Sequence, residues 1–521
     1  MCLTSLYDES LGLTDPARAE GLKLSRKFRE RVAFGEPPAT YSLLPFRFIS
    51  LDSTREILVN EVGEQAVVPR GTAHVVARRQ LDTSSELYRV LRARQFLFDD
   101  QSSPLLDVLA TKYRTKRAFL DGFTKLHIFV VTLRCDHSCH YCQVSRQTAN
   151  RVKYDMSEET AERAMDLMFR SPSPYLTLEF QGGEPLLNFD LVRFIVSRCK
   201  ERAVLTKKQL SIVVATNLAL ATDEMLWFFR DEGINVSTSV DGPAFLHNAN
   251  RPRPGNNSHE ITLQNIERAR AVLGGRHVAA LMTTTRLSLD YPKEIIDEYV
   301  RLGFHSIFLR PISPYGFATR THAKTGYEVE RFLDFYKKGL AYIIDLNRQG
   351  VDISEAYAKI LLTKMLTPFP TRFVDLQSPA GAGISVVVYN YDGDVHASDE
   401  SRMLAEMGDQ RFRLGNVYSD DYQEIFNGRR ITSLVESSVV EALPGCSDCA
   451  FQTYCGADPV FHYTTQRDMV GHRPTSAFCS RNMEIIRHLF SLLADDPEIE
   501  RIFFAWIRER SAERLRAELE P

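Results

Sequence analysis

The sequence predicts an α/β protein built on a partial barrel of six β-α units, with a small winged-helix-like module before the barrel and a cysteine-rich domain after it. Strand-like and helix-like segments alternate from residue 125 to residue 349. A strand-turn-strand pattern precedes them, and a turn-rich segment with four cysteines follows. With 521 residues, the chain has room for about three folded units of roughly 150 residues each.

The chain before the barrel divides into two parts. Residues 1–40 are charged and contain a Pro-Pro pair, which predicts a flexible N-terminal arm. Residues 41–124 begin with two short strand patterns, 47–51 and 56–60, and continue with a capped amphipathic helix from Ser84. We expect a winged-helix-like module and a linker here.

The barrel domain is predicted to span residues 125–349. Its six strand candidates are residues 127–133, 175–180, 210–215, 234–240, 278–284 and 306–309. Amphipathic segments of helical length, such as residues 157–169, lie between them. Because eight units close a full barrel, six units predict a partial, TIM-like barrel with its ligands at the C-terminal ends of the strands.

The chain after the barrel also has two predicted parts. Residues 350–482 are rich in turns and contain the second group of cysteines. Residues 483–521 form a charged amphipathic pattern, which predicts a C-terminal helix.

Composition excludes several classes of protein. Apolar residues make up 44% and charged residues 25% of the chain, which is typical of a globular fold. The formal net charge of -3 gives no overall field that would attract nucleic acid or an anionic membrane. The sequence contains no apolar run of the ~18 residues that a membrane span needs, and its first residues do not resemble a secretory signal. We therefore expect a cytoplasmic protein with no membrane or nucleic-acid partner.

The nine cysteines are expected to bind metal or take part in catalysis, because disulfides are rare in a reducing compartment. Cys2 and Cys199 stand alone, and an isolated cysteine is usually a small buried apolar residue. The other seven form two groups, which are Cys135, Cys139 and Cys142, and then Cys446, Cys449, Cys455 and Cys479.

The first cysteine group directly follows the first predicted barrel strand, with Cys-x3-Cys-x2-Cys spacing. Three thiols can hold a cubane iron-sulfur cluster and leave one iron open for a ligand. The alternative is a zinc site completed by His137 or His140, although structural zinc motifs favour paired Cys-x2-Cys units.

Three further motifs follow in chain order. Residues 181–185, Gln-Gly-Gly-Glu-Pro, end the second predicted strand, Thr216-Asn217 ends the third, and residues 237–243 end the fourth, shortly before Arg251. Together with the cysteine run, in which Tyr141 precedes the third cysteine, they resemble the motifs of radical S-adenosylmethionine enzymes, and the fourth motif resembles that of peptide-modifying members.

This resemblance implies a cofactor and its contacts. The first cysteine group would hold a [4Fe-4S] cluster, and one electron from it would cleave S-adenosylmethionine to methionine and a 5'-deoxyadenosyl radical. The Gly-Gly-Glu motif would hold the methionine amino group, a serine the ribose, an arginine the carboxylate and an aromatic residue the adenine. The implied contacts are Tyr141, Gly182, Gly183, Glu184, Asn217, Ser239 and Arg251. Simple packing is the alternative role for Tyr141.

The second cysteine group resembles the SPASM auxiliary-cluster domain of radical enzymes that modify ribosomal peptides. The family pattern has seven cysteines, and three of these positions are Ala380, Ser398 and Pro459 here. The resemblance therefore implies a single auxiliary [4Fe-4S] cluster with four thiolate ligands. A structural zinc site is the alternative for these four cysteines.

Asp399 follows the second missing cysteine position. In related peptide oxidases an aspartate at this position is a general base, so the resemblance implies a catalytic role for Asp399. The alternative is a solvated helix start.

The overall layout is similar to that of the B-type radical maturases of the His-Xaa-Ser peptide system. It implies an enzyme that oxidatively modifies, or crosslinks, a side chain of a ribosomally made precursor peptide, with residues 41–124 as a peptide-recognition module that pairs its edge strand with the peptide. The implied partners are the precursor peptide, a reducing protein such as a flavodoxin or ferredoxin, and a second maturase. Two alternatives are a sulfatase-type maturase that makes formylglycine and a non-catalytic, zinc-bound peptide-binding scaffold.

Overall fold

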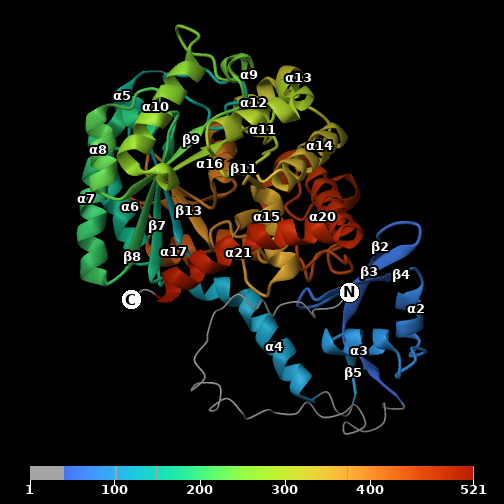
Figure 1. Ribbon diagram of the computed structural model, residues 1–521. Helices are drawn as coiled ribbons and strands as arrows, with labels where there is room; N and C mark the ends of the chain where they lie inside the picture. The colour runs from blue at the N-terminus through green and yellow to red at the C-terminus, as the bar shows by residue number, and fades with distance from the viewer. Residues whose placement is uncertain (1–39, 100–102, 148, 372, 520–521) are drawn as a thin grey trace, which may run out of the picture.

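The computed structural model describes residues 40–99, 103–147, 149–371 and 373–519 (Figure 1). Almost all of the predicted N-terminal arm, residues 1–39, lies outside the described residues.

Among the helices of these ranges, none combines the length and the apolar character that a membrane crossing requires.

A mixed sheet of eight strands, in the order β10-β9-β8-β7-β6-β13-β14-β15, forms the centre of the molecule. Five neighbouring strands run parallel and match the first five predicted barrel strands. They are β6 (Leu126–Thr132), β7 (Tyr175–Gly182), β8 (Gln209–Ala215), β9 (Ile234–Ser239) and β10 (Val278–Leu281). Nearly every side chain of β6 is buried, as expected for a parallel strand covered on both faces.

The sheet continues on the other side of β6 with strands from the late part of the chain. There β13 (Val386–Tyr389) pairs in parallel with β6, and β14 (Asp394–His396) and β15 (Arg413–Asn416) follow in antiparallel orientation. The late domain and the barrel therefore share one sheet and one apolar core.

The sixth predicted strand does not join this sheet. Residues 306–309 contain only the two-residue β11 (Ser306–Ile307), which pairs with β12 (Ser354–Glu355). The amide of Leu309 donates to the Glu355 carboxylate at 3.2 Å, so it is not available to a neighbouring strand. A bond from the Thr284 amide to the Arg310 carbonyl, 2.8 Å long, links this segment to the chain just after β10.

Helices cover the parallel strands on their outer face, where Figure 1 shows α7 and α8 in green. Side-chain caps fix the starts of two of these helices. At the start of α6, Ser157 accepts from the Thr160 amide, and at the start of α8, Thr222 accepts from the Met225 amide. The barrel helices are α5 (Arg151–Tyr154), α6 (Glu158–Phe169), α7 (Phe189–Thr206), α8 (Asp223–Asp231), α9 (Ala244–Asn250), α10 (Ser258–Leu273), α11 (Pro292–Arg301), α12 (Phe317–Arg320), α13 (His322–Thr325) and α14 (Val329–Arg348).

The late part of the chain is mostly helical. The predicted C-terminal helix is in fact two helices, which meet at Asp496 and Pro497, because proline is favoured at a helix start and not in its interior. The late helices are α15 (Ala356–Leu366), α16 (Asp399–Glu406), α17 (Tyr422–Asn427), α18 (Arg429–Glu436), α19 (Pro459–Gln466), α20 (Ala477–Asp495) and α21 (Pro497–Leu519).

The N-terminal module has a sheet and an apolar core of its own. Figure 1 shows it in blue, with α4 (Ser103–Arg117) leading from it towards the barrel. Its other elements are β1 (Ser42–Leu43), β2 (Phe46–Ser50), β3 (Arg55–Asn60), β4 (Gln65–Pro69), α2 (Thr72–Ala77), α3 (Glu86–Ala93) and β5 (Leu97–Phe98). The three-stranded antiparallel sheet has the order β2-β3-β4, and β1 pairs with β5.

The module packs against the late domain. The Tyr454 hydroxyl donates to the Gly63 carbonyl at 2.9 Å, and Arg47 of β2 donates to the carbonyl of Ser447. Both late-domain residues lie in the loop of the second cysteine group.

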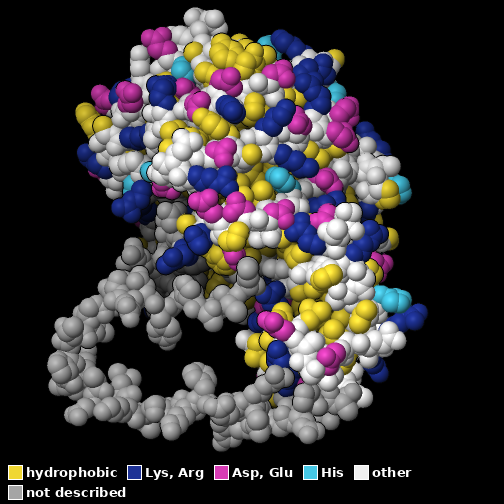
Figure 2. Space-filling view, turned by 45° about the vertical axis from the view of Figure 1, so that its right-hand side comes forward, with side chains coloured by type: hydrophobic (Ala, Val, Ile, Leu, Met, Phe, Trp, Pro, Cys, Tyr) yellow, Lys and Arg dark blue, Asp and Glu magenta, His cyan; other side chains and the backbone are white. Residues whose placement is uncertain are grey.

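On the face shown in Figure 2, acidic and basic side chains are interspersed, in keeping with the small net charge.

Candidate functional site

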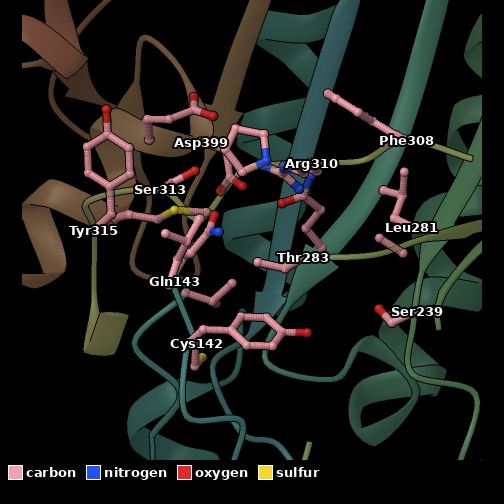
Figure 3. A pocket seen from close by; sticks show the side chains of 18 of the residues that line it. Cys142, Gln143, Ser239, Leu281, Thr283, Phe308, Arg310, Ser313, Tyr315 and Asp399 are labelled. Carbon is pink, nitrogen blue, oxygen red and sulfur yellow. The ribbon is translucent and has the colours of Figure 1, made fainter. Parts of the chain in front are cut away.

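A cavity of about 660 Å³ lies at the C-terminal ends of the parallel strands. Figure 3 shows it between Ser239, Leu281 and Thr283 on the barrel side and Tyr315 and Asp399 on the other. The predicted site residues that line it are Cys135, Cys139, Tyr141, Cys142, Gly182, Gly183, Asn217, Ser239, Arg251 and Asp399. The fold thus brings together residues that come from motifs far apart in the sequence.

Backbone bonds hold the first cysteine group in place. The Ser138 amide donates to the Pro252 carbonyl at 2.7 Å, and the His140 amide donates to the Asn250 carbonyl at 3.2 Å. All three thiols are half-buried. Burial raises the pKa of the Cys139 thiol to about 12, so a thiolate here requires a compensating positive charge such as a bound metal centre.

The two histidines of the cysteine loop have other partners. His137 is buried, with Nδ1 at 3.0 Å from Asp136 Oδ1 and Nε2 at 2.8 Å from Ser258 Oγ. Both ring nitrogens are therefore engaged, and this argues against His137 as a fourth zinc ligand. His140 Nε2 lies 3.3 Å from Lys324 Nζ, away from the cavity lining.

Gly182 and Gly183 bring the ends of β6 and β7 into close contact. A Cβ on Gly183 would lie 2.1 Å from the Arg134 carbonyl oxygen, and one on Gly182 would lie 2.0 Å from the Thr132 carbonyl oxygen. The φ of Gly182 is +144°, which side-chain-bearing residues rarely adopt. Only glycine fits here, and the exposed backbone lines the cavity beside the cysteine loop.

Glu184, which the sequence predicts as a cofactor contact, lies behind the cavity wall in this structure. The Glu184 side chain is fully buried and does not line the cavity. Its carboxylate accepts bonds from Thr216 Oγ1 at 2.6 Å, the Asn217 amide at 2.8 Å and the Leu186 amide at 3.1 Å. Glu184 therefore ties the end of β7 to the end of β8, and burial raises its pKa to about 7.

Tyr141 and Arg251 meet at a third residue, Asp241, which is not among the predicted site residues. The Tyr141 hydroxyl donates to Asp241 Oδ2 at 2.7 Å, and Arg251 Nε lies 3.2 Å from the same oxygen. The Arg251 guanidinium is 5.3 Å from the centroid of the Tyr141 ring. Asp241 belongs to the motif of residues 237–243, which was the available sequence signal for it.

Asp399 lies in the cavity wall that the late domain provides. It is the first residue of α16, which Ser398 caps, so it is a helix start as well as a cavity residue. Its Oδ1 accepts from Arg402 Nε at 3.2 Å. Arg402 is fully buried, and its Nη1 donates to the Val144 carbonyl at 3.4 Å. Asp399 is thus held in an ion pair next to the cysteine loop.

Further charged residues line the same wall. They are Arg310, Asp375, Glu400, Asp458 and Arg481. Burial, together with the nearby carboxylates of Asp375 and Asp399, raises the pKa of Glu400 to about 7. These residues come from separate segments with no shared motif, so the sequence carried no signal for them.

The second cysteine group lies beside α20 and outside the cavity lining. Its four thiols are half-buried, and Cys479 is in the first turn of α20. Burial, together with the other three thiols of the group, raises the pKa of Cys449 to about 12. The Asn482 amide donates to Cys455 Sγ at 3.5 Å. In their chemistry, four thiols are suitable ligands for either an iron-sulfur cluster or a zinc ion.

No three His, Cys, Asp or Glu side chains in the described ranges are grouped closely enough to hold one metal ion.

The three missing cysteine positions have structural roles. Ala380 is buried, and its amide donates to Ser438 Oγ at 3.0 Å. Ser398 forms the cap of α16, and Pro459 is the first residue of α19.

Comparisons with known proteins find similar sequences and similar folds. Residues 129–299 match the Radical SAM superfamily. An uncharacterized protein of Methanocaldococcus jannaschii, MJ0907, is 28% identical over 197 residues, which cover 37% of this chain and 65% of that protein. The serine-type anaerobic sulfatase-maturating enzyme of Bacteroides thetaiotaomicron is 23% identical over 349 residues, which cover 63% of this chain and 80% of that enzyme.

Two solved structures share the fold. The structure of native anSMEcpe with bound AdoMet has a TM-score of 0.59 and 16% identity, and the match covers 73% of this chain and 99% of that one. Streptococcus suis SuiB bound to its precursor peptide SuiA has a TM-score of 0.50 and 13% identity, with coverage of 84% and 99%. The barrel part of this chain, residues 129–299, is thus similar to the radical SAM superfamily.

Proposed function

We propose that this protein is a radical S-adenosylmethionine maturase that oxidatively modifies, or crosslinks, a side chain of a ribosomally made precursor peptide. The observation that carries the proposal is the single cavity that joins the three-thiol loop to the polar wall of the late domain. Its volume of about 660 Å³ lies within the usual ~300–1,000 Å³ of ligand pockets.

The residues present fit the cofactor that the superfamily implies. Cys135, Cys139 and Cys142 would hold one [4Fe-4S] cluster, which leaves one iron open for S-adenosylmethionine. Tyr141, Gly182, Gly183, Asn217, Ser239 and Arg251 line the adjoining space. When bound, the cluster and S-adenosylmethionine supply a 5'-deoxyadenosyl radical.

The chain's own groups orient the reactants. The Arg251 guanidinium supplies the positive charge for the methionine carboxylate, and the glycine backbone allows the amino group to approach closely. On the opposite wall, Asp399 is the general base that accepts a proton from the substrate. Apolar residues such as Phe308 and Tyr336, which line the cavity between these walls, exclude water from it.

The second cysteine group would hold an auxiliary [4Fe-4S] cluster that carries electrons. A flavodoxin or ferredoxin would supply the first electron, and a second maturase would act on the same peptide. The resemblance of the late domain to the SPASM pattern supports this assignment, as does the similarity of the sequence layout to that of the B-type maturases of the His-Xaa-Ser system.

The N-terminal module is proposed to bind the precursor peptide by strand addition. The strand β2 lies at one edge of its sheet, and Phe48 of this strand is 58% exposed. The fold shared with SuiB, which was solved with its precursor peptide, supports a peptide as the substrate.

A sulfatase-type maturase is the second candidate. The relative from Bacteroides thetaiotaomicron, which aligns over 349 residues, favours it. The two candidates differ in their product, because formylglycine is an aldehyde that a hydrazide reagent traps, whereas a crosslinked peptide gives no such adduct.

Anaerobic reconstitution with iron and sulfide tests the proposal. We expect about eight irons in the native chain and about four in Cys139→Ala. With dithionite as the reductant, the native chain should cleave S-adenosylmethionine to 5'-deoxyadenosine, and Cys139→Ala should not. Near-stoichiometric zinc, no iron and no cleavage would overturn the enzyme and leave the zinc-bound scaffold.

A further inference from the structure

Asp241 lies two residues after the end of β9 and contacts both residues that flank the proposed cofactor space. Its Oδ2 accepts from the Tyr141 hydroxyl at 2.7 Å and pairs with Arg251 Nε at 3.2 Å. Its Oδ1 accepts from the Thr283 amide at 3.3 Å, just beyond the end of β10. The Asp241 side chain is itself fully buried and does not line the cavity, so it acts through its neighbours.

The Asp241 carboxylate is the counter-charge of a buried guanidinium. The Arg251 side chain is 12% exposed, and within the described residues Asp241 is its only ion-pair partner. A buried charge that loses its partner is costly, so the position of Arg251 depends on Asp241. Because Tyr141 binds the same carboxylate oxygen, Asp241 fixes the two side chains relative to each other.

The backbone of Asp241 begins a hydrogen-bond chain of fixed direction. Its amide can only donate, and it donates to His247 Nδ1 at 3.3 Å. The proton of His247 therefore lies on Nε2, which donates to Ser258 Oγ at 3.0 Å. The Ser258 hydroxyl then donates to His137 Nε2 at 2.8 Å, and His137 Nδ1 donates to Asp136 Oδ1 at 3.0 Å. The chain ends inside the cysteine loop.

We propose that Asp241 is a positioning residue for S-adenosylmethionine: it holds Tyr141 and Arg251 towards the cavity and links them to the cysteine loop. This inference rests on the proposed function, because Tyr141 and Arg251 act on the cofactor only if the chain binds it. The Asp241 carboxylate orients Tyr141 and Arg251, and these two side chains contact S-adenosylmethionine.

Binding of S-adenosylmethionine to the oxidised, reconstituted holoenzyme tests the inference. Without a reductant the cofactor is not cleaved, so anaerobic calorimetry reports affinity alone. Asp241→Asn should weaken binding roughly tenfold or more, as expected for a lost bond to a charged group, and leave the iron content unchanged. The matched control is Asp394→Asn, which breaks the 2.6 Å ion pair between Asp394 of β14 and Arg413 of β15 and should leave the affinity unchanged.

Double-mutant cycles separate positioning from general stability. Tyr141→Phe and Arg251→Lys should each weaken binding in the native chain and have a much smaller effect in the Asp241→Asn background, because their shared anchor is already lost. If Asp241→Asn does not fold, the pair Tyr141→Phe and Arg251→Lys gives the same information, since both side chains contact the same oxygen. Their combined effect should then be smaller than the sum of the two.

Two results would overturn this inference but not the proposed function. One is a folded Asp241→Asn variant that binds S-adenosylmethionine as tightly as the native chain does. The other is that the effects of the three substitutions on this affinity are simply additive. Failure of the native chain to take up iron or to bind S-adenosylmethionine would overturn the proposed function as well, so the two failures are distinguishable.

Discussion

Asp399 and Glu400 are adjacent at the start of α16, and both line the cavity, yet their carboxylates have different surroundings. Asp399 is paired with the buried Arg402. Glu400 faces Asp375, Asp399 and Asp458 as well as Arg310 and the Tyr315 hydroxyl. Because Glu400 is buried and most of its charged neighbours are carboxylates, its neutral form is favoured over its ionised form.

This difference predicts how stability depends on pH. The pKa of Glu400 in the folded chain is about 7, above its usual 4.5, so the fold loses stability as pH rises through this range and Glu400 becomes ionised. Glu400→Gln cannot ionise. Its free energy of unfolding should exceed that of the native chain by an amount that grows from pH 5 to pH 8, to about 3 kcal/mol. Urea unfolding followed by circular dichroism at each pH measures the difference.

The control for this experiment is Glu260→Gln on α10, which changes the same side chain outside the cavity lining. A difference between Glu400→Gln and the native chain that does not vary with pH would contradict the prediction.

Glu184 shows that a sequence motif does not reveal all the contacts that its residues make in the folded chain. Gly182 and Gly183 line the cavity, as the Gly-Gly-Glu-Pro pattern led us to expect. The Glu184 carboxylate instead binds Thr216 and the Asn217 amide, which lie just after β8. The motif itself contains no information about these partners, because they come from another strand.

At the scale of the elements, the contact between β6 and β7 shapes the base of the cysteine loop. A Cβ at Gly183 would collide with the backbone of Leu133 and Arg134, which cannot move without shifting that loop. Gly183→Ala should therefore destabilise the fold by about 3 kcal/mol and lower the iron content after reconstitution. Thermal unfolding and iron analysis check both effects.

The matched control is Gly275→Ala. A Cβ at Gly275 meets nothing within 4 Å, so stability should be unchanged or slightly higher. A Gly183→Ala chain that is as stable as Gly275→Ala and takes up as much iron would contradict the close contact seen here.

The parallel strands of the barrel were predictable because each is a short apolar run between amphipathic segments. The pairing of β11 was not predictable, because it depends on Glu355. The Glu355 carboxylate accepts a hydrogen bond from the Leu309 amide, although the two residues are 46 positions apart in the sequence. The addition of β13 to the free side of β6 also depends on residues more than 250 positions away. Local patterns identify strands, whereas these pairings are decided by tertiary contacts.

The same limit applies to the site. Cysteine spacing and glycine pairs are local signals, and they pointed to residues that do line the cavity. Asp375, Glu400 and Asp458 come from separate segments of the late domain and meet only in the folded chain. The sequence therefore indicated the cofactor side of the cavity better than the opposite wall.

At the scale of the whole molecule, the two cysteine groups occupy different places. The first lines the cavity, whereas the second lies at the junction of α20 with the loop that contacts the N-terminal module. We expect the two groups to hold their clusters independently. Cys446→Ala combined with Cys479→Ala should remove about half of the iron and still allow dithionite-driven formation of 5'-deoxyadenosine, because the cavity is unchanged.

Iron and sulfide analysis, electron paramagnetic resonance of the reduced protein and chromatography of the nucleoside product measure this outcome. The control is Cys199→Ala, which removes a fully buried thiol from α7 and should keep all of the iron and all of the cleavage. If the double variant lost cleavage in proportion to its iron, the two groups would form one coupled centre, and separate roles for the barrel and the late domain would be wrong. If it kept all of its iron, the second group would not bind an iron-sulfur cluster, and zinc analysis of the same samples would show whether it holds a structural zinc ion instead.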